Sequence, residues 1–170
     1  MVLAAAALFP FAFSKENRRA IRERPIAFFF VGLTAAGASF PLITYATLHL
    51  GAGVAAVLNG LTPVFAVLIA WVWLKEKLSM TLVAGVAVAW LGVAVLALSR
   101  SPAPYSSGVI DSVGFLLPCL AALGGTFLYG LGANLAKGHL AGVNPTAISG
   151  GALFLAAIMD LPLAWAYYPE

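Results

Sequence analysis

Long apolar runs alternate with short charged or polar segments along this chain. Each of these runs is about 20 residues or longer, the length that an α-helix needs to cross a hydrocarbon core of roughly 30 Å. They cover Ile26–Leu48, Val54–Leu74, Ser79–Leu98, Val113–Ala136 and Pro145–Tyr168. The apolar stretch 2–13 is shorter, so it predicts the end of a helix or a short span. The pattern predicts an all-α polytopic transmembrane helix bundle with about five full spans and a short N-terminal one.

Composition supports a membrane environment. The chain is 62% hydrophobic and 9% charged, whereas soluble domains are about 45–50% apolar and about 25% charged. The net charge of +3 does not indicate a nucleic-acid partner, because the charges lie between apolar runs and form no basic face. The single Cys119 excludes an intrachain disulfide and a cysteine-based metal site.

The basic residues predict the orientation of the spans. If the chain crosses the membrane at every run, eight of the nine Lys and Arg residues fall on one side, which is the cytoplasmic side by the positive-inside rule. We therefore expect an integral protein of the inner or plasma membrane, with residues 14–25, 75–79 and 137–144 in the cytoplasm. Only Arg100 falls opposite. Aromatic residues near the span ends resemble interfacial anchors: Trp71, Trp73, Trp165, Tyr167 and Tyr168.

Three stripes of small residues recur at helical spacing. They are Gly32–Ala36–Ser39, Gly85–Ala89–Gly92 and Thr126–Gly130–Asn134. Small side chains let helix backbones approach closely in lipid, so the stripes favour helix packing. Lining of a substrate cavity is the alternative.

Uncharged polar and aromatic residues inside the runs are candidates for a substrate cavity. Pro63 cannot donate a hydrogen bond to the carbonyl of Asn59, four residues earlier, which frees that carbonyl near mid-span and favours a kink. The alternative is a structural kink with a helix–helix hydrogen bond. The full set of candidates is Thr44, Tyr45, Asn59, Thr62, Pro63, Trp90, Tyr129 and Asn134.

Ionisable residues are rare within the runs, and such residues are functional candidates in a membrane. Asp160 lies inside the last run and is a candidate for proton coupling or for binding a substrate amine; the alternative places it near the outer interface, where Leu161-Pro162 breaks the helix. His49 and Glu76 are better explained as interfacial and helix-start residues. No catalytic motif such as H-E-x-x-H, G-x-S-x-G or Walker A is present, so we expect no enzyme, no metal and no cofactor.

The order of features from Tyr45 to Gly92 resembles the EamA-type domain of the drug/metabolite transporter superfamily. Tyr45-Ala46-Thr47-Leu48 matches the end of the family's third helix, and Pro63 matches its fourth. Glu76 matches the following turn, and two spaced glycines match the fifth helix. The resemblance covers residues 26–98. Lys75-Glu76-Lys77 departs from the more usual Gly-Glu-Arg of the family.

That resemblance implies ten helices in two inverted five-helix repeats. Residues 1–98 would then hold the end of the first repeat, helices 2 to 5 with helix 2 incomplete. Residues 99–112 would be an outer linker, and 113–170 would be helices 6 and 7. The implied function is secondary-active export of a small metabolite, such as an amino acid, by alternating access. The alternative is a non-transporting membrane subunit or truncated remnant that works only after dimerisation.

Overall fold

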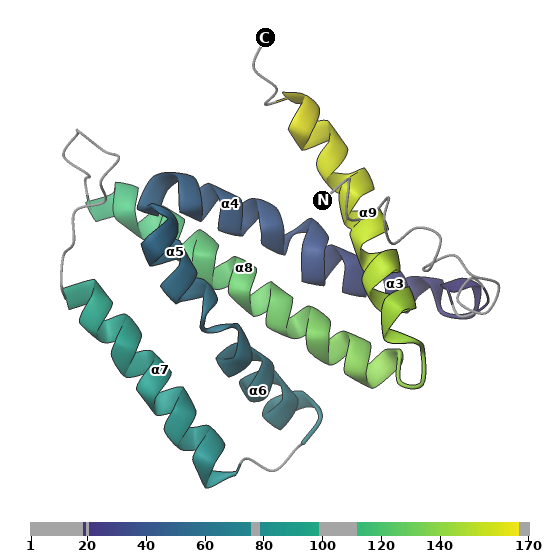
Figure 1. The fold of residues 1–170 in the computed structure, drawn as a ribbon, viewed down its shortest axis with the longest axis horizontal. Coiled ribbons are helices and arrows are strands. Elements are labelled where there is room, and N and C mark those ends of the chain that lie inside the picture. Colours follow the sequence, from purple (N-terminus) through teal and green to yellow (C-terminus); the bar gives the residue numbers. More distant parts are fainter. Residues whose placement is uncertain (1–18, 20, 76–78, 99–111, 167–170) are drawn as a thin grey trace. The chain divides into compact units, whose positions relative to one another are not determined.

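A computed structural model describes residues 19, 21–75, 79–98 and 112–166, and every regular element among them is a helix (Figure 1). The elements are α3 (Pro25–Gly32), the π-helix η1 (Leu33–Gly37), α4 (Ser39–Leu50), α5 (Ala52–Asn59), α6 (Thr62–Trp73), α7 (Met80–Leu98), α8 (Ser112–His139) and α9 (Pro145–Ala166). Several predictions fall outside the described residues, namely those on 2–13, Lys15, Arg18, Glu76, Lys77, Arg100, the loop 99–111, Tyr167 and Tyr168, as well as the side chain of Trp165.

The helices confirm an all-α bundle of apolar spans. Among the described residues, three stretches are long and apolar enough to cross a membrane: Pro25–Leu50, Ala52–Trp73 and Leu116–His139. The other two predicted spans coincide with α7 and α9, apolar helices of 19 and 22 residues.

The chain divides into two compact units. Unit 1 comprises Met1–Ser39 and Leu131–Glu170, and unit 2 comprises Phe40–Gly130. Helix α8 contributes its first part to unit 2 and its last part to unit 1.

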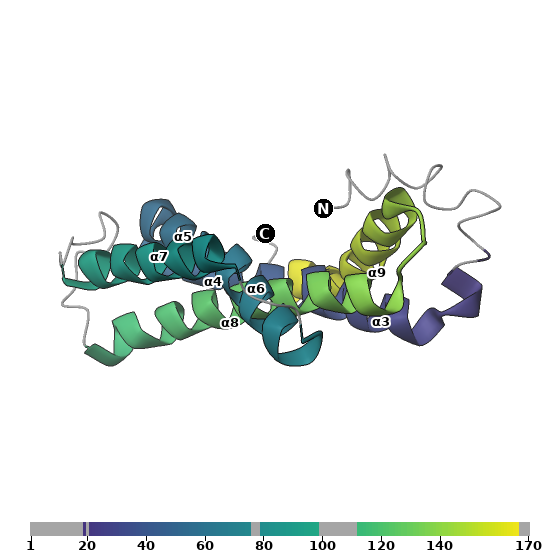
Figure 2. The same cartoon turned by 90° about the horizontal axis from the view of Figure 1, so that it is seen from below.

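In unit 1, α9 packs across α3 and η1 (Figures 1 and 2). Phe28 and Val31 of α3 form a buried cluster with Leu140 and Ala152. Gly32 belongs to a predicted small-residue stripe, and a Cβ added there would lie 3.0 Å from Leu155 of α9. This stripe therefore acts as a packing seam, because a larger residue at Gly32 would push the two helices apart.

The turn before α9 is defined by its own side chains. The Asn144 side-chain oxygen accepts hydrogen bonds from the Thr146 N–H (3.0 Å) and hydroxyl (2.8 Å). Pro145 occupies the first helical position, where its missing N–H costs nothing. On the other side of the turn, Arg24 donates a hydrogen bond of 2.6 Å to the His139 carbonyl at the end of α8. The predicted linker 137–144 is shorter than expected, since α8 continues to His139.

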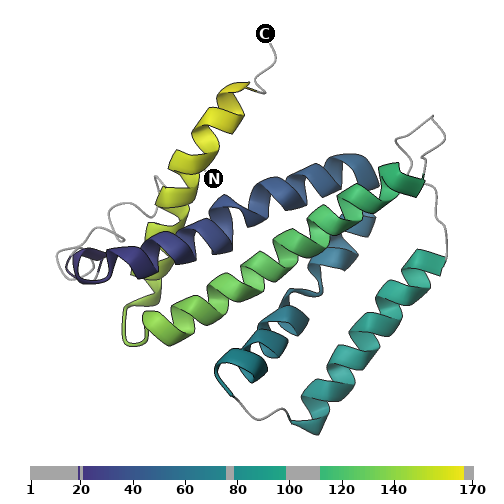
Figure 3. The same cartoon turned by 180° about the vertical axis from the view of Figure 1, so that it is seen from behind.

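In unit 2, α4 lies beside the first part of α8, and α7 runs along α5 (Figures 1 and 3). Ala46 and Leu50 of α4 form a buried cluster with Leu58 and Ala122. A single residue, Gly51 with φ 80°, lies between the end of α4 and the start of α5. The five-residue gap predicted between the runs Ile26–Leu48 and Val54–Leu74 is therefore wrong, because α4 continues through the buried Leu50 and α5 begins directly after the glycine.

Helix α7 exposes most of its described side chains. Val88 is 68% exposed and Leu91 is 65% exposed. A Cβ added at Gly85 or Gly92 would meet nothing within 4 Å. The small-residue stripe of α7 is thus no packing seam within the described residues, unlike the stripe that contains Gly32.

Replacing Lys75 with glycine should stabilise the protein. Lys75 follows the end of α6 with φ 54°, a left-handed conformation that costs an L-residue about 1–2 kcal/mol and that glycine adopts freely. The midpoint of thermal unfolding in detergent should rise by about 2–4 °C for a gain of about 1 kcal/mol. Lys75→Ala is the matched control, since it removes the same charge but keeps the Cβ; an equal shift in both variants would attribute the effect to charge.

Candidate functional site

The second long apolar stretch is interrupted at the position predicted from Pro63. Helix α5 ends at Asn59 and α6 begins at Thr62, with a turn at Gly60 and Leu61. The Asn59 carbonyl accepts a hydrogen bond of 2.7 Å from the Thr62 hydroxyl. The carbonyl that Pro63 cannot pair is therefore capped by a side chain three residues away, which makes the interruption locally stable.

Replacing Thr62 with valine should lower the stability of the protein at this interruption. The substitution keeps the side-chain shape but leaves the Asn59 carbonyl without its hydroxyl donor, a loss of about 1–2 kcal/mol in apolar surroundings. Thr47→Val is the matched control, because the Thr47 hydroxyl bonds the Ile43 carbonyl within an intact helix. Thermal unfolding in detergent should show a lower midpoint for Thr62→Val alone, and equal midpoints would contradict this role of Thr62.

The remaining candidates of unit 2 lie on three helices. Thr44 and Tyr45 are exposed on α4, where the Tyr45 ring lies against His49 with 4.2 Å between ring centroids. His49 also hydrogen-bonds the Tyr45 carbonyl through Nδ1 at 2.8 Å, which agrees with a structural histidine. On α8 the Tyr129 ring packs edge-on against Phe40 at 6.4 Å, and on α7 Trp90 is 44% exposed.

Two candidates belong to unit 1. Asn134 on α8 is buried, with an exposed fraction of 5%. On α9, Asp160 is partly buried, and its Oδ1 is buried with no hydrogen-bond partner among the described residues. Helix α9 continues past Leu161-Pro162 to Ala166, so the alternative in which that dipeptide breaks the helix is wrong. A buried carboxylate oxygen without a partner can bind a proton or a cationic group.

Among the candidates, the structure joins Asn59 and Thr62 by hydrogen bonds and spreads the others over two units. A common cavity lined by all of them therefore stays a prediction. Sequence reasoning missed Gly132, where an added Cβ would lie 2.7 Å from the backbone nitrogen of Ala35. Its signal was the repeated glycine spacing in Gly130-Leu131-Gly132.

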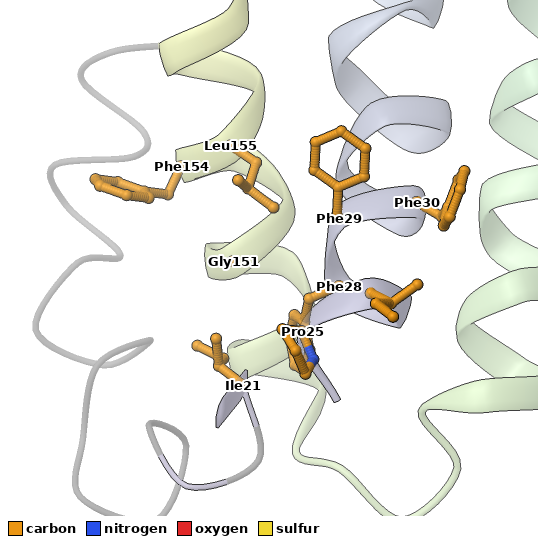
Figure 4. A pocket seen from close by; sticks show the side chains of 9 residues that line it. Ile21, Pro25, Phe28, Phe29, Phe30, Gly151, Phe154 and Leu155 are labelled. Carbon is orange, nitrogen blue, oxygen red and sulfur yellow. The ribbon is translucent and has the colours of Figure 1, made fainter. Parts of the chain in front are cut away.

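Sequence reasoning also missed a cleft in unit 1 between α3 and α9 (Figure 4), called here the α3–α9 cleft. It has a volume of about 630 Å³, within the range of about 300–1,000 Å³ that is usual for ligand pockets. Every lining residue is apolar: Ile21, Pro25, Ile26, Phe28, Phe29, Phe30, Gly151, Phe154 and Leu155. Such walls offer no side-chain hydrogen bond, so the cleft suits a hydrocarbon and not a polar metabolite.

Apolar spans, an interrupted helix and a partly buried carboxylate define a polytopic helical membrane protein. The model of the EamA-like transporter family matches residues 1–98, more than half of the 170-residue chain. The protein therefore belongs to the EamA-like transporter family, within the drug/metabolite transporter superfamily.

Comparison with curated proteins gives one informative relative. Over 76 residues the chain is 38% identical to a Streptantibioticus cattleyicolor protein named as a probable terminal-alkyne amino-acid exporter. The match covers 45% of this chain and 26% of the relative's length. No solved structure gives a significant match.

Proposed function

We propose that this protein takes part in secondary-active export of a small amino-acid-like metabolite. The observation that carries the proposal is membership of the EamA-like transporter family, and the exporter name of the 38%-identical relative supports the substrate class. Transport would use alternating access between two inverted repeats, with residues 1–98 ending the first repeat and 113–170 beginning the second.

The interruption between α5 and α6 supports this mechanism. Discontinuous helices in transporters present backbone groups to substrates near the bilayer midplane. Asn59, Thr62 and Pro63 would line the substrate path at this point, and Asp160 would couple transport to a proton gradient. Thr44, Tyr45, Trp90, Tyr129 and Asn134 complete the proposed cavity lining.

The exposed face of α7 supports a second candidate function. Gly85 and Gly92 meet open space, and large apolar residues beside them are exposed. Such a face suits further transmembrane helices, either from a second copy of the chain or from another subunit. A cysteine placed at Gly85 should then cross-link in membranes. For a subunit that acts only in an assembly of two copies, the product should have the mass of a dimer instead of a monomer.

The proposed orientation places residues 14–25, 75–79 and 137–144 in the cytoplasm. In a Cys119→Ser background, single cysteines at Lys77 and Ser106 should react with impermeant maleimide from opposite sides of the membrane. Labelling of both from the same side would contradict the orientation.

Export itself can be tested in cells. A host that accumulates amino acids should release at least one of them faster when it expresses this chain than when it carries an empty vector. Gly132→Ala is the negative control, because the destabilised protein should reach the membrane in lower amount. Equal release from all three strains for every amino acid would contradict export by this chain.

A further inference from the structure

We propose that the α3–α9 cleft binds an acyl chain of an anionic phospholipid from the cytoplasmic leaflet, with Arg22 contacting its headgroup. The proposal goes beyond metabolite export and rests only on the proposed orientation of residues 14–25. It combines two observations, the wholly apolar lining of the cleft and the exposed Arg22 directly after the lining residue Ile21.

The shape of the cleft suits a hydrocarbon chain. Its walls come from Ile21, from residues 25–30 of α3 and from residues 151–155 of α9 (Figure 4). Gly151 keeps it open, since a Cβ there would lie 3.0 Å from the Phe28 ring. Ile26 and Phe29 remain 71% and 45% exposed beside it, so an acyl chain would cover apolar surface that the described residues leave open.

Charge at the mouth favours an anionic headgroup. Residues 14–25 carry five basic and two acidic side chains, and Arg22 follows directly after the cleft residue Ile21. Glu23 pairs with Arg19 at 2.7 Å, and this bond raises the pKa of the Arg19 guanidinium. Arg22 is exposed and has no ion pair among the described residues. A basic side chain at the cytoplasmic surface attracts the negatively charged lipids of that leaflet.

A hydrogen bond of Arg24 holds the segment that carries Arg22 next to the cleft. The Arg24 guanidinium is already bound to the His139 carbonyl at 2.6 Å, which fixes the segment directly before Pro25. Among the described residues 19 and 21–25, Arg22 is thereby the basic side chain without an ion pair or a hydrogen bond to the protein, and it can meet a phosphate. The competing occupant is the apolar segment 2–13 of the same chain, and the experiment below distinguishes it.

The test places p-benzoylphenylalanine at Phe29 of the full chain. The chain is reconstituted in vesicles with equal amounts of phosphatidylglycerol and phosphatidylcholine, irradiated, and analysed by mass spectrometry. We expect phosphatidylglycerol adducts in clear excess, and Arg22→Gln should lower that excess about five-fold. Lys75→Gln, which removes a charge elsewhere on the proposed cytoplasmic side, should leave it unchanged. The same probe at Phe127, 42% exposed on α8, should give equal adducts of both lipids.

Two results would overturn the proposal: equal adducts of both lipids at position 29, or an internal cross-link to residues 2–13. The unmodified chain provides a measurement that does not depend on the probe. Native mass spectrometry after mild detergent extraction should retain phosphatidylglycerol over phosphatidylcholine, with the same loss in Arg22→Gln. Equal retention of the two lipids, or a preference that Arg22→Gln leaves intact, would also contradict the site.

Discussion

Gly132→Ala should destabilise the protein by about 3 kcal/mol or more. An added Cβ would lie 2.7 Å from the Cβ and backbone nitrogen of Ala35 and 2.8 Å from its Cα. Backbone atoms cannot rotate away as a side-chain end does, so α8 and η1 must separate within unit 1. For a chain of this size the midpoint of thermal unfolding should fall by roughly 6–12 °C, with a matching loss of monodisperse protein in detergent.

Gly85→Ala is the matched control for this effect. It adds the same methyl group to a helical glycine, but nothing lies within 4 Å of the new atom. Helix propensity favours alanine over glycine by about 1 kcal/mol at either site, so Gly85→Ala should leave the midpoint unchanged or raise it. Equal midpoints for the two variants would show that the close approach of Gly132 to Ala35 does not stabilise the fold.

Asp160→Asn should abolish the dependence of transport on a proton gradient. The Oδ1 of Asp160 is buried without a hydrogen-bond partner among the described residues, and an amide there keeps the volume but cannot exchange a proton. Gradient-driven accumulation in proteoliposomes should fall about ten-fold or more. Exchange of labelled for unlabelled substrate, which needs no net proton movement, should continue.

Asp160→Glu controls for the shape of this site. It retains a carboxylate on α9 and should keep a measurable response to the gradient. An Asp160→Asn variant that accumulates substrate as well as the original chain would remove Asp160 from the coupling mechanism and leave it a structural residue.

The sequence predicted the spans better than their contacts. Apolar runs located the helices from α3 to α9, because burial in lipid requires a continuous apolar length. Pro63 located the interruption between α5 and α6, since a missing N–H acts within the same helix. The sequence did not predict that Thr62 caps the Asn59 carbonyl, although a hydroxyl three residues away is a local feature.

Contacts between helices could not be predicted in the same way. The stripes containing Gly32 and Gly85 look alike in the sequence, yet Gly32 packs on Leu155 and Gly85 meets open space. A stripe shows which face of a helix carries small side chains, but not which element packs against that face. The α3–α9 cleft was missed for the same reason, because its walls are more than 100 residues apart in the chain.

We propose that this member of the EamA-like transporter family moves an amino-acid-like metabolite across a membrane. The most direct measurement is efflux from sealed proteoliposomes loaded with a panel of labelled amino acids. We expect saturable efflux of at least one of them, above that from protein-free liposomes and strongly reduced by Gly132→Ala. Leak-free vesicles that contain folded protein and show no flux for any member of the panel would contradict the claim.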